Sequence, residues 1–319
     1  MLGNGGVQLR QFTEPEQVTN AQGGVFCEVV PTGPGPFGAA LHSISMGDVT
    51  LNMGRVSACM GLLRAAPDRA LLQLPLEGSE SLVLNAVPYR PGMVGTYAGG
   101  ADLLRVGSKP NSFATLVLPS DSVEKLLNPA AESRLLQPGD FALLQARPTF
   151  FDQAKRIIIA ARATASTVPE TFEAEQPRHA LREALLKAAH DLVSPEPDAE
   201  FRIPRSTRAR QRIVLRAEEY LRAQMDRPIY TEELCDALAA SASSLAEAFR
   251  AVFGVSPHRF LKLRRMSMVR AALRSYEGPM PLVKSVALAH GFWHLGQFAH
   301  DYRKTFGEMP SETLARARG

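Results

Sequence analysis

The chain has 319 residues and a mass of 34.7 kDa, a length that predicts two domains. Hydrophobic residues make up 45% and charged residues 21% of it, which excludes a disordered or fibrous protein. No apolar run approaches the ~18 residues that a membrane span needs, and no secretion signal is recognisable at the start. The three cysteines, Cys27, Cys59 and Cys235, are too scattered for a disulfide framework or a zinc site. We therefore expect a cytoplasmic protein with no membrane partner.

The charge is divided unevenly along the chain. Residues 205–319 hold 19 basic and 11 acidic residues, a net charge of +8. Residues 1–204 hold 17 basic and 21 acidic residues, a net charge of −4. This asymmetry predicts a polyanionic partner for the C-terminal part alone.

The first 118 residues contain short apolar runs separated by glycine and proline turns, a pattern that predicts a β-sandwich or a small β-barrel. The runs cover residues 25–30, 40–46, 49–53, 71–76, 82–84, 93–97 and 113–118. Helices are expected next, at residues 120–127, 150–162 and 177–192. The last of these carries an apolar stripe that would serve dimerisation or packing on its own sheet equally well.

A linker is expected at residues 194–207, where a proline-broken polar stretch meets an arginine-rich run. It would separate an N-terminal domain, residues 1–193, from a C-terminal domain, residues 208–319. Almost all of the C-terminal domain has helical patterning. Thr231 stands where one helix N-cap belongs, and Ser256-Pro257 predicts the start of a long helix that runs to about Ser275.

The most informative feature of the sequence is an internal repeat. Phe249-Arg250-x-x-Phe253-Gly254-x-x-Pro257-x-x-x-Leu261 recurs 53 residues later as Tyr302-Arg303-x-x-Phe306-Gly307-x-x-Pro310-x-x-x-Leu314. Each copy follows a short helix, a tight turn and a second helix, which is the helix-turn-helix pattern. Two α-hairpins of an ordinary bundle would look similar, but the duplication inside a strongly basic segment favours DNA binding.

The second copy also supports a family resemblance. Gly291-Phe292-Trp293-His294-Leu295-Gly296-Gln297-Phe298, followed by Tyr302-Arg303-Lys304-x-Phe306-Gly307-x-x-Pro310-Ser311, resembles the C-terminal signature of AraC/XylS-family transcription regulators. The sequence of this stretch is especially similar to the branch of ethanolamine-operon regulators. The resemblance covers residues 212–314 and implies two recognition helices that enter successive major-groove segments on one face of DNA. The N-terminal part resembles the family's sensor domains only in layout.

The resemblance implies which side chains read bases. In the first recognition helix they are Ser243, Ala246, Glu247 and Arg250, and in the second Leu295, Gly296, Gln297, His300 and Arg303. Glu247 is as well explained as a solvated charge, and His300 as a phosphate contact. Trp293 is expected to pack the turn onto the preceding helix. Basic residues of the central helix are expected to divide between solvent and the DNA backbone: Lys262, Arg264, Arg265, Arg270 and Arg274.

Residues 1–204 contain no recognisable set of catalytic groups, so we expect no enzyme, no cofactor and no metal. We expect instead a sensor domain whose ligand and pocket residues cannot be read from the sequence.

The predicted fold is α+β in two domains: a β-rich barrel or sandwich with helices, then an all-α double helix-turn-helix domain. The predicted function is that of a metabolite-responsive transcription regulator, an activator rather than a repressor. It is expected to bind promoter double-stranded DNA and to contact RNA polymerase. It could also form a homodimer. The alternatives are a DNA-binding regulator without a small-molecule ligand, controlled by abundance or by a protein partner, and an enzyme fused to a DNA-binding tail.

Overall fold

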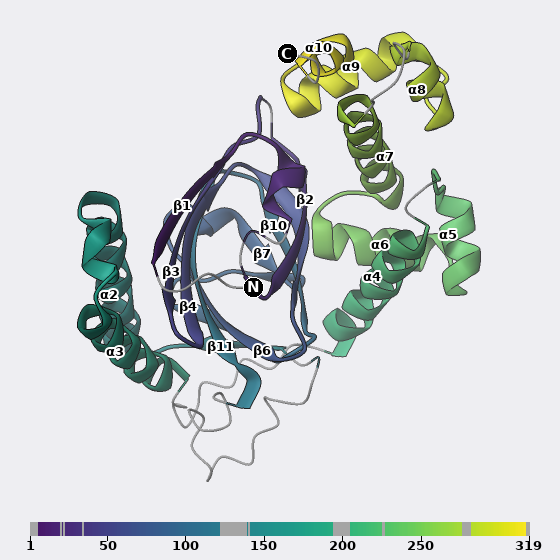
Figure 1. The fold of residues 1–319 in the computed structure, drawn as a ribbon. Coiled ribbons are helices and arrows are strands. Elements are labelled where there is room, and N and C mark those ends of the chain that lie inside the picture. Colours follow the sequence, from purple (N-terminus) through teal and green to yellow (C-terminus); the bar gives the residue numbers. More distant parts are fainter. Residues whose placement is uncertain are drawn as a thin grey trace.

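The structure is a computed structural model that describes residues 6–121, 139, 141–193, 205–224, 227–275 and 282–316, except 20, 22 and 34. The described part forms an N-terminal domain of two antiparallel sheets with helices, followed by a helical C-terminal domain (Figure 1). This confirms the α+β fold and decides for a sandwich, because the two sheets do not close into a barrel. No helix among the described residues has the length and apolar character to cross a membrane.

The larger sheet has seven strands and the smaller sheet five. The larger sheet has the order β1 (Val7–Phe12), β3 (Ala39–Met46), β4 (Val49–Val56), β11 (Asn111–Pro119), β6 (Arg69–Pro75), β9 (Met93–Tyr97) and β12 (Phe141–Gln145). The smaller sheet has the order β2 (Val25–Pro31), β5 (Cys59–Ala65), β10 (Asp102–Gly107), β7 (Leu82–Leu84) and β8 (Val87–Pro88). All seven predicted runs are strands. Strands β1, β5, β8, β10 and β12 were not predicted.

The two sheets face each other across a common apolar core. Because side chains alternate along a strand, β5 sends Cys59 and Leu63 into this core and sends Met60 and Leu62 to the opposite face. Both faces of each sheet are therefore covered. This explains why a strand such as β5 carries apolar residues on both faces instead of alternating them with polar residues.

Two helices, α2 (Pro148–Thr167) and α3 (Glu175–Val193), cover the outer face of the seven-stranded sheet (Figure 1). The apolar stripe of α3, with Leu185, Ala188 and Leu192, is buried in one cluster with Ile44 of β3 and Leu116 of β11. The stripe therefore packs on its own domain, one of the two alternatives that the sequence left open. The helix predicted at residues 120–127 lies outside the described residues from 122 onward.

The C-terminal domain consists of two helix-turn-helix units joined by one long helix. Its helices are α4 (Arg205–Ala223), α5 (Thr231–Leu238), α6 (Ala242–Phe253), α7 (Pro257–Arg274), α8 (Val283–Ala289), α9 (Leu295–Phe306) and α10 (Pro310–Arg316). Ser256 caps α7 as predicted, because its hydroxyl accepts a hydrogen bond from the Arg259 amide at 3.3 Å. The N-cap prediction for Thr231 is wrong: Tyr230 is the N-cap, and Thr231 is the first helical residue.

The C-terminal domain is docked on the outer face of the five-stranded sheet (Figure 1). Val30, Met60, Leu62 and Leu104 from this sheet belong to the same buried apolar cluster as the core of the helix-turn-helix domain. Ion pairs border the contact. Arg264 of α7 lies 3.1 Å from Glu28 of β2, and Arg270 pairs with Glu14 and Glu16 in the segment after β1.

Candidate nucleic-acid interface

The first recognition helix, α6, divides its residues between a buried and an exposed face. Leu245, Ala248 and Phe249 are fully buried, because their spacing of three and four residues places them on the side that packs against α4 and α7. Ser241 caps the helix by accepting a hydrogen bond from the Ser244 amide at 3.1 Å. The inner face thus fixes the direction in which the other side chains of α6 point.

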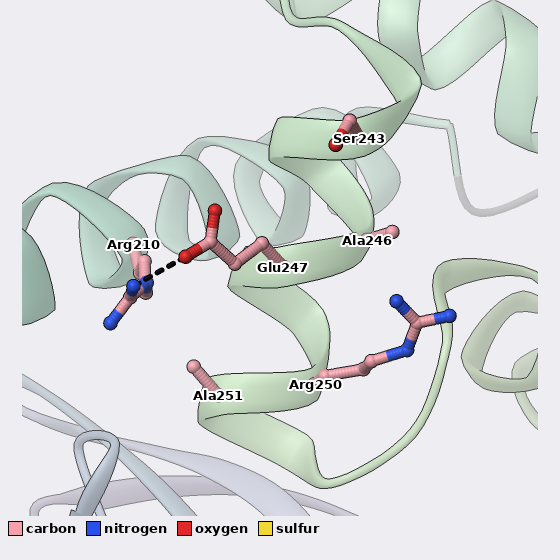
Figure 2. A pocket seen from close by; sticks show the side chains of 6 residues that line it. All are labelled: Arg210, Ser243, Ala246, Glu247, Arg250 and Ala251. Atoms are coloured by element: carbon pink, nitrogen blue, oxygen red, sulfur yellow. Dashed lines mark hydrogen bonds and ion pairs between the residues drawn. The ribbon is translucent and has the colours of Figure 1, made fainter.

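The four predicted DNA contacts of α6 lie together on its outer face. Ser243, Glu247 and Arg250 are exposed, and Ala246 is half-buried. They line an open pocket of about 670 Å³ together with Arg210 of α4 and Ala251 (Figure 2). The structure therefore brings the first predicted group of site residues to one surface.

Glu247 forms an ion pair with Arg210 across this pocket (Figure 2). The pair joins α4 to α6 and partly offsets a negative charge that would otherwise repel a DNA phosphate. The side chain of Arg250, one turn further along α6, is exposed and forms no hydrogen bond or ion pair with any described residue, whereas the Arg250 carbonyl accepts a hydrogen bond from the Gly254 amide. Its guanidinium is the unpaired cation at this pocket among the residues that the structure describes.

The second recognition helix, α9, repeats the arrangement. Phe298, Tyr302 and Phe306 are buried and pack against one another with their rings tilted, neighbouring ring centroids being 5.6 Å and 4.7 Å apart. Of the predicted contacts, Leu295 is half-buried and the other four are exposed: Gly296, Gln297, His300 and Arg303. The second predicted group therefore also lies on one helix surface.

The side chain of Gln297 is held by an acidic partner. Its amide nitrogen donates to Asp301 Oδ2 at 2.9 Å, and Lys262 of α7 donates to the same oxygen at 2.5 Å. Burial alone would raise the pKa of Asp301, but the hydrogen bonds from Lys262 and Gln297 hold this pKa below its ordinary value. Sequence reasoning missed Asp301 as a positioning residue; its signal is the spacing of four from Gln297 on one helix.

The internal repeat places the residues of α9 53 positions after their counterparts in α6, so the outer surfaces of the two helices can be compared position by position. It relates Arg250 to Arg303, and Glu247 to His300. Arg303, like Arg250, is exposed and has no ion pair with a described residue. Each unit thus presents a free arginine at the same position of its recognition helix. The other compared position carries the acidic Glu247 in the first unit and the imidazole of His300 in the second.

Helix α7 holds the two units together through a buried arginine. The Arg265 guanidinium lies 4.8 Å from the Tyr230 ring of the first unit and 5.1 Å from the Phe292 ring of the second. Gly291, at the turn of the second unit, has φ of +78°, and an added Cβ there would lie 2.1 Å from the Tyr230 hydroxyl. The two turns are therefore packed against one connecting residue.

Two expectations about this domain are wrong. Trp293 does not pack the turn, because it is 73% exposed. The basic residues of α7 do not divide between solvent and DNA, since Arg265 and Arg270 are buried and the other three have acidic partners in the protein: Asp301 for Lys262, Glu28 and Glu218 for Arg264, and Glu14 for Arg274. The exposed arginines Arg205, Arg208, Arg212 and Arg216 of α4 remain as basic surface.

Comparison with known proteins assigns this fold to a class. A family model described as a helix-turn-helix domain matches residues 234–316. XylDLEGF operon transcriptional activator 2 of Pseudomonas putida is 36% identical over 100 residues, 31% of this chain and 64% of that protein. The crystal structure of a probable AraC family transcriptional regulator from Rhodopseudomonas palustris is 41% identical, over 34% of this chain and 99% of that one, with a TM-score of 0.31. The AraC-like transcriptional activator CuxR is 16% identical over 83% of this chain and 95% of that one, with a TM-score of 0.40.

The C-terminal domain is a double helix-turn-helix domain of the AraC type, as the two units on α7 and these matches agree. The resemblance to AraC/XylS-family regulators that was read from the second repeat is confirmed for the C-terminal domain. The chain spans about a third of the length of most curated relatives that it matches here, and 64% of XylDLEGF operon transcriptional activator 2.

Proposed function

We propose that this protein is a sequence-specific transcription regulator that binds promoter DNA through α6 and α9. It acts in this proposal as an activator rather than a repressor. The observation that carries the proposal is the pair of equivalent recognition surfaces, each with an exposed and unpaired arginine, fixed to one connecting helix. A rigid pair of this kind suits two major-groove segments about 10 base pairs apart. Site residues are those predicted from the sequence: Ser243, Ala246, Glu247, Arg250, Leu295, Gly296, Gln297, His300 and Arg303.

The N-terminal domain, residues 1–193, acts in this proposal as the sensor for a small metabolite. The linker predicted at residues 194–207 leads to the DNA-binding domain, and its last three residues belong to α4, which begins at Arg205. The support is the continuous apolar cluster between the five-stranded sheet and the helix-turn-helix core, which gives the two domains a way to affect each other. A ligand can shift this arrangement only if it binds one arrangement more tightly than another. The regulator would act in the cytoplasm, contact RNA polymerase when bound at a promoter, and have no catalytic activity.

The proposal is tested by selecting genomic fragments with the purified full-length protein at a stated salt concentration and sequencing them. The expected result is a motif with two elements about 10 base pairs apart. The double variant Arg250→Ala/Arg303→Ala should lose this enrichment, whereas Arg156→Ala, which removes an exposed arginine of α2, should retain it. Enrichment without a motif, or an unchanged motif in the double variant, would overturn the assignment of α6 and α9 as the reading helices.

A further inference from the structure

A row of polar side chains crosses the inner face of the seven-stranded sheet. In the strand registers, Ser43 pairs with Asn52, Asn52 with Thr115, and Thr115 with Gln73. Gln73 in turn pairs with Gly95 of β9. The positions two residues away along these strands, such as Leu71 and Phe113, belong to the core between the sheets, so strand alternation turns the row inward as well.

Tyr97 extends the row at its β9 end. Its ring folds back over Gly95, where an added Cβ would lie 2.7 Å from the Tyr97 hydroxyl. Burial raises the pKa of Tyr97 above its ordinary value, so the hydroxyl stays protonated and can donate a hydrogen bond. The row therefore offers donors and acceptors across four neighbouring strands: β4, β11, β6 and β9.

Most of these polar groups have no protein partner. Four atoms make no hydrogen bond with any described residue: Asn52 Nδ2, Thr115 Oγ1, Gln73 Oε1 and Tyr97 Oη. Their residues are between 0% and 4% exposed. Buried polar atoms in folded proteins are almost always paired, because each unpaired one is costly. A whole row of them is a place where the polar groups of a ligand or of bound water complete the hydrogen bonds.

The facing sheet contributes a buried cation. Arg105 of β10 is 4% exposed, its Nη2 donates to Asn111 Oδ1 at 2.5 Å, and its guanidinium lies 5.6 Å from the Phe113 ring. Its Nε is unpaired, and no carboxylate among the described residues lies within ion-pair distance. Its positive charge acts on Tyr97, Cys27 and Cys59, which places Arg105 near the same interior region. A buried arginine cannot shed its proton, so it requires an anion.

We propose that Arg105 and the row formed by Asn52, Thr115, Gln73 and Tyr97 select the effector of this domain, and that this effector is a small organic hydroxycarboxylate. The carboxylate would pair with Arg105, and a hydroxyl group of the ligand would bind along the row formed by Asn52, Thr115, Gln73 and Tyr97. The inference rests on the proposed function, in which the N-terminal domain senses a metabolite. An inorganic ion is too small for this arrangement, because the row from Asn52 to Gln73 crosses two strand spacings, about 10 Å.

The proposal is tested by thermal unfolding of the full chain with three hydroxycarboxylates: lactate, malate and mandelate. Each is compared with its neutral amide. At least one carboxylate should raise Tm in a concentration-dependent manner, and its amide should not. Tyr97→Phe and Thr115→Val should weaken the apparent affinity at least tenfold. Both should leave the Tm of the ligand-free protein unchanged or higher, because the hydroxyl that each removes has no protein partner.

Thr96→Val is the matched control. Thr96 is buried on the opposite face of the same sheet, where its hydroxyl donates to the Ala142 carbonyl at 3.5 Å, so the variant should keep the full ligand-induced shift. An equal shift with sodium sulfate would overturn the proposal and leave a non-selective anion site. Absence of any shift, with destabilisation by Thr115→Val, would mean that the row is a structural water network. Neither result depends on DNA, so the fragment selection separates failure of this site from failure of the proposed function.

Discussion

At the scale of single residues, Gln297 is a proposed base-reading side chain with a defined hydrogen-bond partner in the protein. Its amide nitrogen donates a hydrogen bond to Asp301, and the residue is exposed on α9. A bidentate contact with adenine requires both the amide nitrogen and the carbonyl oxygen, so binding must exchange the Asp301 hydrogen bond for one to the base. Lys262 remains as a partner for Asp301 after that exchange, which lowers its cost.

We therefore predict that Gln297→Ala relaxes base preference at one operator position, by about 1–3 kcal/mol in discrimination. Competition binding against a set of single-base operator variants measures this. Lys304→Ala is the control, since loss of an exposed cation should weaken all sequences alike and flatten the salt dependence. An unchanged preferred sequence in Gln297→Ala would show that α9 is placed differently on DNA.

Glu218 predicts a pH dependence of stability. This carboxyl group of α4 is buried 3.5 Å from Arg264, and burial raises its pKa to about 7, with Arg264 acting in the opposite direction. In the unfolded chain it loses its proton near the ordinary value of 4.5. Between these two values the folded state binds more protons than the unfolded state, so this group makes stability fall as the pH rises from 4.5 to about 7.

Glu218→Gln should remove that slope. Relative to the wild type, the free energy of unfolding of the variant should rise by about 3 kcal/mol between pH 4.5 and pH 8. Urea unfolding at a series of pH values measures the difference. Glu219→Gln changes the exposed neighbour on the same helix and should leave the slope as it is. A parallel pH profile for Glu218→Gln would mean that Glu218 is ionised throughout this range.

At the scale of secondary-structure elements, the turn of the first helix-turn-helix unit contains a strained residue. Ala239 ends α5 with φ of +48°, a left-handed conformation that costs a residue with a Cβ roughly 1 kcal/mol. Ala239→Gly should therefore stabilise the domain by up to about 1 kcal/mol. Ala237→Gly, two residues earlier in the helix, should destabilise it by about the same amount. Thermal unfolding of the two variants should give shifts of opposite sign; shifts of the same sign would show that the strain is absent.

The elements of the C-terminal domain were predictable because their signals are local. Ser256-Pro257, the glycines after each recognition helix and the 53-residue repeat each specify a helix end within a few residues. The strand-rich domain was predicted only in part, since β5 and β10 are buried on both faces and have no alternating pattern. Arg105 was overlooked for the same reason. It stands in an apolar strand, and only the pairing of β10 with β5 and β7 shows that it points inward.

At the scale of the whole molecule, no pattern in the sequence indicates that the two domains touch. The contacts of Arg264 with Glu28 and of Arg270 with Glu14 and Glu16 join residues more than 230 positions apart. Without these partners the arginines of α7 look like DNA-binding residues, which is why that expectation failed. The pairing of opposite charges also explains how an acidic N-terminal part and a basic C-terminal part can share one interface.

Leu62 allows a test of this arrangement, because it lies on the outer face of the five-stranded sheet and is 2% exposed through its contact with the helical domain. Leu62→Glu places an unpaired charge in that contact, which disfavours the docked state by several kcal/mol while leaving the core between the sheets untouched. The radius of gyration from small-angle scattering should rise. Leu9→Glu makes the same change at a leucine that is 56% exposed on β1 and should leave the radius unchanged. If domain docking couples the sensor to DNA, Leu62→Glu should also abolish the reciprocal effect of ligand and operator on each other's affinity. A compact variant with intact coupling would contradict this arrangement.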